Sequence, residues 1–192
     1  MKFANMLAAT SVLAVNLIVQ PNALATNTIT FNGNVTDATC DVALKYEGAE
    51  VGTKGTGTIT LNDVSKVDLK TADASAGQVH FYIVAKNCSL GDPAKTLIAA
   101  TFTSANGDNQ GLLNNIAGSG KATNVKLRLL DSKRTFIKVN DPTQKDSTAY
   151  STINTTGTDP ETEILYFVEY VSQGDATAGL VSSTVDYELA YK

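Results

Sequence analysis

The 192-residue chain has no tryptophan, one histidine, two cysteines and four prolines, and only 18% of its residues are charged. The single histidine, His80, excludes metal sites that need two or more imidazole ligands, and two cysteines are too few for a zinc finger. The motifs HExxH, GxSxG and paired CxxC are also missing. The formal net charge of −4, without a run of lysine or arginine, argues against nucleic acid or an anionic membrane as a partner.

The first 25 residues predict a cleaved secretory signal peptide. Lys2 gives a positive start, and an apolar stretch from Leu7 to Val19 follows it. Ala23–Ala25 has the small-x-small pattern that a signal peptidase cleaves. The apolar stretch is shorter than the ~20 residues of a membrane span, and an uncleaved N-terminal anchor is the alternative. We therefore expect an exported protein that begins at Thr26 after cleavage.

Export would place the two cysteines in an oxidising compartment. An oxidising compartment favours a bridge between Cys40 and Cys88, the one pair that the chain can form. Two free thiols or a redox pair are the alternative, and the CxxC spacing typical of redox pairs is absent. In the chain-entropy model, closing so long a loop contributes up to roughly 4 kcal/mol of stability.

The hydrophobic pattern after residue 26 has a period of two, which is typical of half-buried β-strands. Alternating segments are Cys40–Tyr46, Val79–Ala85, Val125–Leu129 and Val185–Tyr191. Further apolar, β-branched runs are Gly57–Leu61, Leu97–Thr103, Thr135–Val139 and Ile164–Val171. Turn-rich segments separate them: Asn87–Pro93, Ser104–Gly111, Ala117–Lys121, Asn140–Asp146 and Asn154–Pro160. Many short strands with this spacing, and no helix of three turns, predict an all-β antiparallel sandwich.

The segment from Thr26 to Thr39 has a strand pattern with one irregular position. Alternate residues fall on one face: Ile29, Phe31, Gly33 and Val35. Gly33 stands where a packed side chain is expected, although glycine weakens a strand. One interpretation is that this row enters a groove whose floor is raised opposite Gly33. The alternative is an ordinary first strand with a bulge.

Several short motifs occur in a fixed order behind the signal peptide. They are Ile29–Val35, Ala38–Val42, Phe81–Cys88, Ala122–Leu129, Ala176–Gly179 and the terminal Tyr187–Lys192. Taken together and in this order, they resemble the pilin subunits of chaperone–usher fimbriae, the type 1 fimbrial protein family. The spacing between the cysteines is longer than in many relatives, which we interpret as an insertion near Gly48–Gly57.

The resemblance implies an incomplete immunoglobulin-like sandwich, residues 40–192, that lacks its last strand. It implies that residues 26–39 are a donor-strand extension, and that Ile29, Phe31, Gly33 and Val35 fill the groove of a neighbouring subunit. The acceptor and chaperone-binding residues lie on the C-terminal strand: Val185, Tyr187, Leu189 and Tyr191. The implied partners are further copies of the chain in a head-to-tail polymer, a periplasmic chaperone, an outer-membrane usher, other fimbrial subunits and a host receptor. No cofactor is implied.

Four other features suggest sites only weakly. Gly118–Lys121 is a fragment of a phosphate-binding loop without its first glycine, and we expect a surface turn there. His80 lies on the polar side of its strand, where we expect an exposed histidine. Asn106–Asn109 lacks the carboxylate spacing of a calcium loop. The N-x-S/T tripeptides matter only if a host glycosylates them, and they begin at Asn34, Asn87 and Asn154.

Three classes of function remain. The favoured one is a structural subunit, specifically a major shaft pilin that supports cell adhesion at the cell surface, because the chain is short and rich in small residues. A minor adaptor or a side-binding adhesin that recognises a host receptor is the alternative. Tip adhesins of the family carry a lectin domain in place of the extension, and one domain is expected here. An enzyme is disfavoured, since no catalytic constellation is visible.

Overall fold

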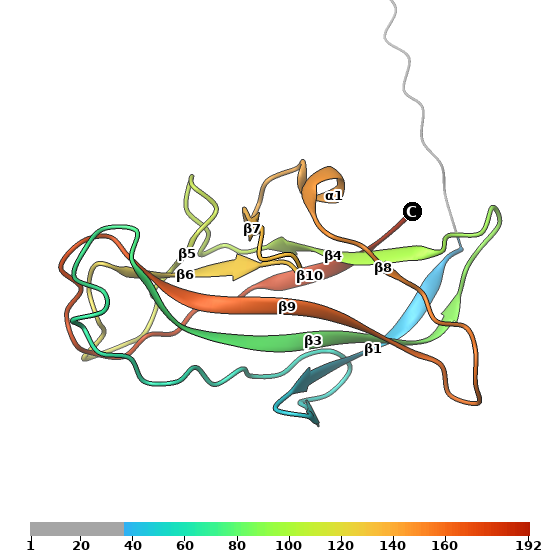
Figure 1. Ribbon diagram of the computed structural model, residues 1–192, viewed down its shortest axis with the longest axis horizontal. Coiled ribbons are helices and arrows are strands. Elements are labelled where there is room, and N and C mark those ends of the chain that lie inside the picture. The colour runs from blue at the N-terminus through green and yellow to red at the C-terminus, as the bar shows by residue number, and fades with distance from the viewer. Residues whose placement is uncertain (1–36) are drawn as a thin grey trace, which may run out of the picture. The chain divides into compact units, whose positions relative to one another are not determined.

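The computed structural model describes residues 37–192, which form two antiparallel β-sheets (Figure 1). The elements are β1 (Thr39–Tyr46), β2 (Ala49–Val51), β3 (Ser75–Ser89), β4 (Leu97–Thr103), β5 (Leu113–Asn114), β6 (Val125–Leu130), β7 (Phe136–Ile137), α1 (Gln144–Ser147), β8 (Ser151–Thr152), β9 (Glu161–Ser172) and β10 (Asp186–Tyr191). The prediction of an all-β fold is confirmed, and α1 is a single turn. Within residues 37–192, no helix has the length and apolar character to cross a membrane.

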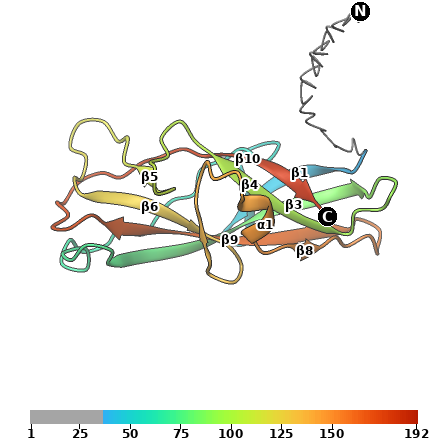
Figure 2. The ribbon, with the colours of Figure 1, turned by 90° about the horizontal axis from the view of Figure 1, so that it is seen from above.

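The two sheets differ in size. The larger contains β2, β1, β3, β9, β6 and β5 in that order, with β7 also paired to β6. The smaller contains β10, β4 and β8. Every pair of neighbouring strands is antiparallel. Figures 1 and 2 show β3 and β9 side by side in one layer and β4 beside β10 in the other.

The core lies between the two sheets and is built from alternate residues of their strands. Ile83 of β3, Ile164 of β9 and Phe102 of β4 are almost fully buried. The ring of Phe102 meets the ring of Tyr166 edge-on, with 5.0 Å between centroids. Because successive side chains of a strand point to opposite faces, the period of two in the sequence becomes one apolar face on each sheet.

The segment Gly57–Leu61, which the sequence predicts to be a strand, is not one. Ile59 and Leu61 are half-buried against the core, so the alternation predicts their burial correctly. The backbone, however, pairs with a side chain: the Tyr46 hydroxyl donates a hydrogen bond to the carbonyl oxygen of Thr60 (2.5 Å). Alternating burial is therefore present here in a segment that is not a strand, because no strand of residues 37–192 pairs with its backbone.

Two other boundaries also differ from prediction. The run Thr135–Val139 contributes only Phe136–Ile137 to a strand. The segment Asn87–Pro93, expected to be a turn, begins inside β3, which continues to Ser89. It does so because Ser89 pairs with Thr39 at the start of β1.

The expected disulfide is present between Cys40, near the start of β1, and Cys88, near the end of β3. The register of the β1–β3 ladder shifts at this point, between Thr39 and Asp41. The bond therefore joins two neighbouring strands where their ladder is irregular. Among the residues described, no free cysteine remains.

Candidate functional site

The candidate site is the outer edge of β10, which pairs only with β4 within residues 37–192. Lys192 and Leu97 exchange two backbone hydrogen bonds, each of 3.0 Å. In an antiparallel ladder, bonded and non-bonded pairs alternate. The backbone N–H and C=O groups of Tyr187, Leu189 and Tyr191 therefore point away from β4, where an added strand would pair with them.

The residues predicted to accept a strand lie together on one face of this edge. They are Val185, Tyr187, Leu189 and Tyr191. All four pack against the hydrophobic core, yet all four are only partly buried. Asp186 and Glu188, which alternate with them, are exposed. The core is thus incompletely covered along the same strand that has outward-facing backbone groups.

The side of β4 that faces away from β10 is treated differently. β8 pairs with Leu97 and Ile98, and side chains cover the positions that follow. The Tyr166 hydroxyl accepts a hydrogen bond from the N–H of Ala100 (2.7 Å). The Gln144 amide accepts from the N–H of Phe102 (2.7 Å) and donates to its C=O (2.8 Å), as a strand would. No side chain or strand of residues 37–192 does the same for the outer backbone groups of β10. One edge of this sheet is therefore closed, and the other is open within the described part of the chain.

A tyrosine hydroxyl connects β10 to the larger sheet. Tyr187 donates to the carbonyl oxygen of Gly55 (3.0 Å), just after β2. The Tyr187 bond therefore links β10 to the segment that follows β2 in the larger sheet. Burial raises the pKa of both Tyr187 and Tyr191, and the nearby backbone of Cys40, at the start of β1, partly offsets the rise for Tyr191.

Gly55 is required by this contact. Its φ is +74°, and a Cβ atom at this position would lie 2.3 Å from the Tyr187 hydroxyl. A larger residue would displace Tyr187 and strain the backbone.

The four predicted donor residues are outside the described residues. They are Ile29, Phe31, Gly33 and Val35, and the possible glycosylation site Asn34 is also among residues 1–36. The predicted acceptor residues are therefore brought together, whereas the predicted donor row stays a prediction.

Three of the weaker candidates lie within the described residues. His80 is exposed, and its ring forms a T-shaped pair with the ring of Tyr82, with 5.7 Å between centroids. Gly118–Lys121 is an exposed turn. Asp108, in the Asn106–Asn109 segment, already accepts hydrogen bonds from Lys126 (2.5 Å) and from backbone N–H groups. These bonds outweigh the effect of partial burial and lower the pKa of Asp108.

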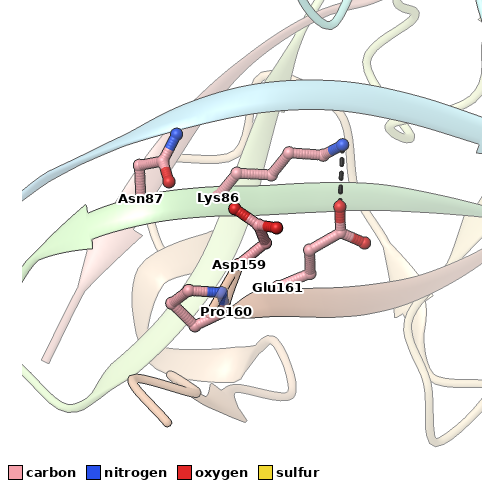
Figure 3. Close-up of a pocket in the computed structure, with 5 residues that line it drawn as sticks. All are labelled: Lys86, Asn87, Asp159, Pro160 and Glu161. Atoms are coloured by element: carbon pink, nitrogen blue, oxygen red, sulfur yellow. Dashed lines mark ion pairs between the residues drawn. The ribbon is translucent and has the colours of Figure 1, made fainter. Parts of the chain in front are cut away.

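A surface hollow of about 260 Å³ lies beside the end of β3 (Figure 3). Its lining residues are Lys86, Asn87, Asp159, Pro160 and Glu161. Lys86 forms ion pairs with Glu161 (2.8 Å) and Glu50, and these bonds raise the pKa of Lys86 and lower that of Glu161. The ammonium group is thus paired with carboxylates from β9 and β2.

The residues that close the far edge of β4 were not identified from the sequence. Gln144 is hydrogen-bonded to the backbone of Phe102, 42 positions away, and Tyr166 to that of Ala100, 66 positions away. Their residue types alone carry no signal for such long-range pairing. Tyr166 lies in a predicted strand, so only its burial could have been expected.

Residues 37–192 form an immunoglobulin-like sandwich in which the outer edge of β10 has no partner strand. In general, an exposed sheet edge of this kind is where a protein can accept a strand from a partner. A family model described as "Fimbrial protein" matches residues 29–192. The major fimbrial subunit SMF-1 of Stenotrophomonas maltophilia is 35% identical over 87% of this chain and 93% of its own length. The minor fimbrial subunit HifD of Haemophilus influenzae is 32% identical over 85% of this chain and 73% of its own length.

Solved structures show the same fold. A subunit of a chaperone–usher pilus matches with a TM-score of 0.53 and 19% identity, over 88% of this chain and 97% of that one. The P pilus rod subunit PapA matches with a TM-score of 0.51 and 17% identity, over 71% and 93% of the two chains. The chain belongs to the fimbrial protein family, which consists of structural pilins.

Proposed function

We propose that this protein is a polymerising subunit of a chaperone–usher fimbria that accepts a donor strand along the outer edge of β10. The observation that carries the proposal is the coincidence of two features on one strand. The outward backbone groups belong to Tyr187, Leu189 and Tyr191, and the half-buried core side chains belong to the same residues. A partner strand at this edge forms hydrogen bonds with the outward-facing N–H and C=O groups and also covers the exposed part of the core.

The donor in this proposal is the N-terminal extension of another copy of the chain, within residues 26–39. Its row of Ile29, Phe31, Gly33 and Val35 has the spacing of side chains on one face of a strand. An added strand forms main-chain hydrogen bonds along its length, and alternate side chains fill pockets. Because the interface is head-to-tail and does not close, the product is a filament.

We further propose that residues 1–25 are a cleaved signal peptide and that the subunit passes through the periplasm to the cell surface. The disulfide between Cys40 and Cys88 agrees with an oxidising compartment on that route. A periplasmic chaperone covers the edge of β10 before assembly, and an outer-membrane usher receives the subunit.

Within the fimbria, we propose the role of the major shaft subunit. Its support is the match to a major subunit over 93% of that relative's length. A minor adaptor role is the second candidate, because the minor subunit HifD is 32% identical.

Electron microscopy of a strain that lacks the gene is expected to show no fibres. A repeated shaft subunit supplies the length of the fibre, so no other subunit replaces it. Short or rare fibres in that strain would instead assign the adaptor role, and complementation with the wild-type gene is the control.

Deletion of Tyr191 and Lys192 is expected to lower the amount of chaperone-bound subunit. The deletion removes the end of β10, together with the packing of Tyr191 against the core and the backbone hydrogen bonds between Lys192 and Leu97. A pull-down on tagged chaperone from periplasmic extract measures the recovery. The matched control is Lys192→Ala, which keeps the backbone of the strand, and unchanged recovery of the deletion variant would contradict the assignment.

A further inference from the structure

Large hydrophobic side chains are exposed at three positions in residues 37–192. They are Val67, Leu180 and Ile116, with exposed fractions of 71%, 64% and 45%. All three belong to loops, specifically the segments 61–74, 115–124 and 173–182. In both views these loops gather at one end of the sandwich, away from the start of β1 (Figures 1 and 2).

Backbone hydrogen bonds hold the three loops together. Asp175 N–H donates to the carbonyl of Lys70 (2.8 Å), which joins the first loop to the third. Ile116 N–H donates to the carbonyl of Ser182 (2.8 Å), which joins the second to the third beside Leu180. The exposed residues therefore belong to three loops that are hydrogen-bonded to one another, and we call this set of loops the loop end. Exposed apolar residues that gather in this way mark an interaction site more often than single ones do.

The length of chain between the predicted donor row and the folded body limits how far apart two joined subunits can lie. The carboxylate of Asp37 accepts a hydrogen bond from the N–H of Asp92 (3.2 Å), so the body already includes Asp37. Only Thr36 lies between Asp37 and Val35, the last residue of the predicted donor row. The chain from Val35 to Asp37 therefore spans no more than about 7 Å. A body of this size has a radius of gyration of roughly 15 Å. Two bodies joined in this way must touch.

The direction of the donor strand decides which end is touched. All neighbouring strands in the described residues are antiparallel, and an antiparallel donor continues that pattern on β10. Ile29 then lies near Tyr191, and Val35 lies near Val185. Because β10 follows directly after the loop that contains Leu180, the donor leaves the groove at the loop end.

We propose that the loop end is a second contact surface between successive subunits, covered by the body of the copy that donates its strand. The inference rests on the proposed function. Its partner is a second copy of this chain, and its apolar contact is made by Val67, Leu180 and Ile116. The contact orients the joined bodies in addition to the strand that links them.

The experiment measures maleimide labelling of Leu180→Cys in two states of the full chain. We expect rapid labelling in the chaperone-bound monomer and loss of labelling in purified fibres. Val67→Cys, on a separate loop, has the same expected result and replaces Leu180→Cys should that variant fail to fold. Ser132→Cys, in the exposed turn between β6 and β7, is the matched control and should label in both states. Mass spectrometry checks that the Cys40–Cys88 bond is intact.

A six-residue Gly/Ser insertion between Thr36 and Asp37 identifies which copy gives the protection. The longer linker lets the bodies separate, so labelling of Leu180→Cys should return while the fibres persist. Labelling that is equal in monomer and fibre, or protection that survives the insertion, would overturn the proposal. Absence of any fibre from the wild-type chain would instead count against the proposed function.

Discussion

Gly33→Leu is expected to fold and bind chaperone normally but to be unable to join the next subunit. If the groove beside β10 is narrow opposite Gly33, a leucine there cannot be seated without displacing the donor strand. Overpacking of this kind costs ~1–3 kcal/mol or more. The subunit's own core does not use Gly33 in this proposal, so its folding is unaffected. The measurement is a gel of unboiled periplasmic and surface fractions, where joined subunits persist as a ladder.

Asn34→Leu is the matched control, because it adds the same side chain to the opposite face of the same strand. We expect it to keep a wild-type ladder. Deletion of residues 26–36 is expected to reproduce the Gly33→Leu phenotype, namely a folded, chaperone-bound subunit that does not donate. A wild-type ladder from Gly33→Leu would mean that the segment is an ordinary first strand. Loss of the monomer together with the ladder would mean that Gly33 serves folding.

The double substitution of Cys40→Ser and Cys88→Ser is expected to leave little stable subunit in the periplasm. Loss of a native disulfide from a small exported domain costs ~2–5 kcal/mol, a large part of the net stability of most domains. The bond also joins β1 to β3 where their ladder is irregular, so few backbone bonds replace it. Immunoblots of periplasmic extract measure the subunit, and surface fractions measure the fibre.

Cys40→Ser alone should lose as much subunit as the double variant, because either substitution removes the same bond. Ser89→Ala, next to Cys88 and exposed, is the control and should accumulate normally. A normal yield of fibres from the double variant would show that the disulfide is dispensable for assembly.

The sequence predicted the strands with a clear alternation well. The segments around Ile83, Leu127 and Leu189 lie in β3, β6 and β10, as expected. It was wrong for Gly57–Leu61, where alternating burial is present but the backbone is bonded to the Tyr46 side chain. A period of two reports which side chains face the core, and it does not report whether a neighbouring strand is available for pairing.

The acceptor row illustrates the same distinction at the candidate site. The alternation of Tyr187, Leu189 and Tyr191 was visible in the sequence, and family resemblance suggested its role. The outer backbone of this row has no partner within residues 37–192, whereas Gln144 and Tyr166 cover the far side of β4. Both facts depend on residues that are far apart in the chain.

By itself, the sequence determined the all-β class, the pairing of Cys40 with Cys88 and the family, because periodicity, cysteine number and motif order are local or countable properties. Only the tertiary structure decided which sheet edge is open and which is covered. It also decided that Val67, Ile116 and Leu180 gather at one end. The physical reason is that an edge or a surface is defined by what packs beside it. For β10 and β4, those neighbours come from distant parts of the chain.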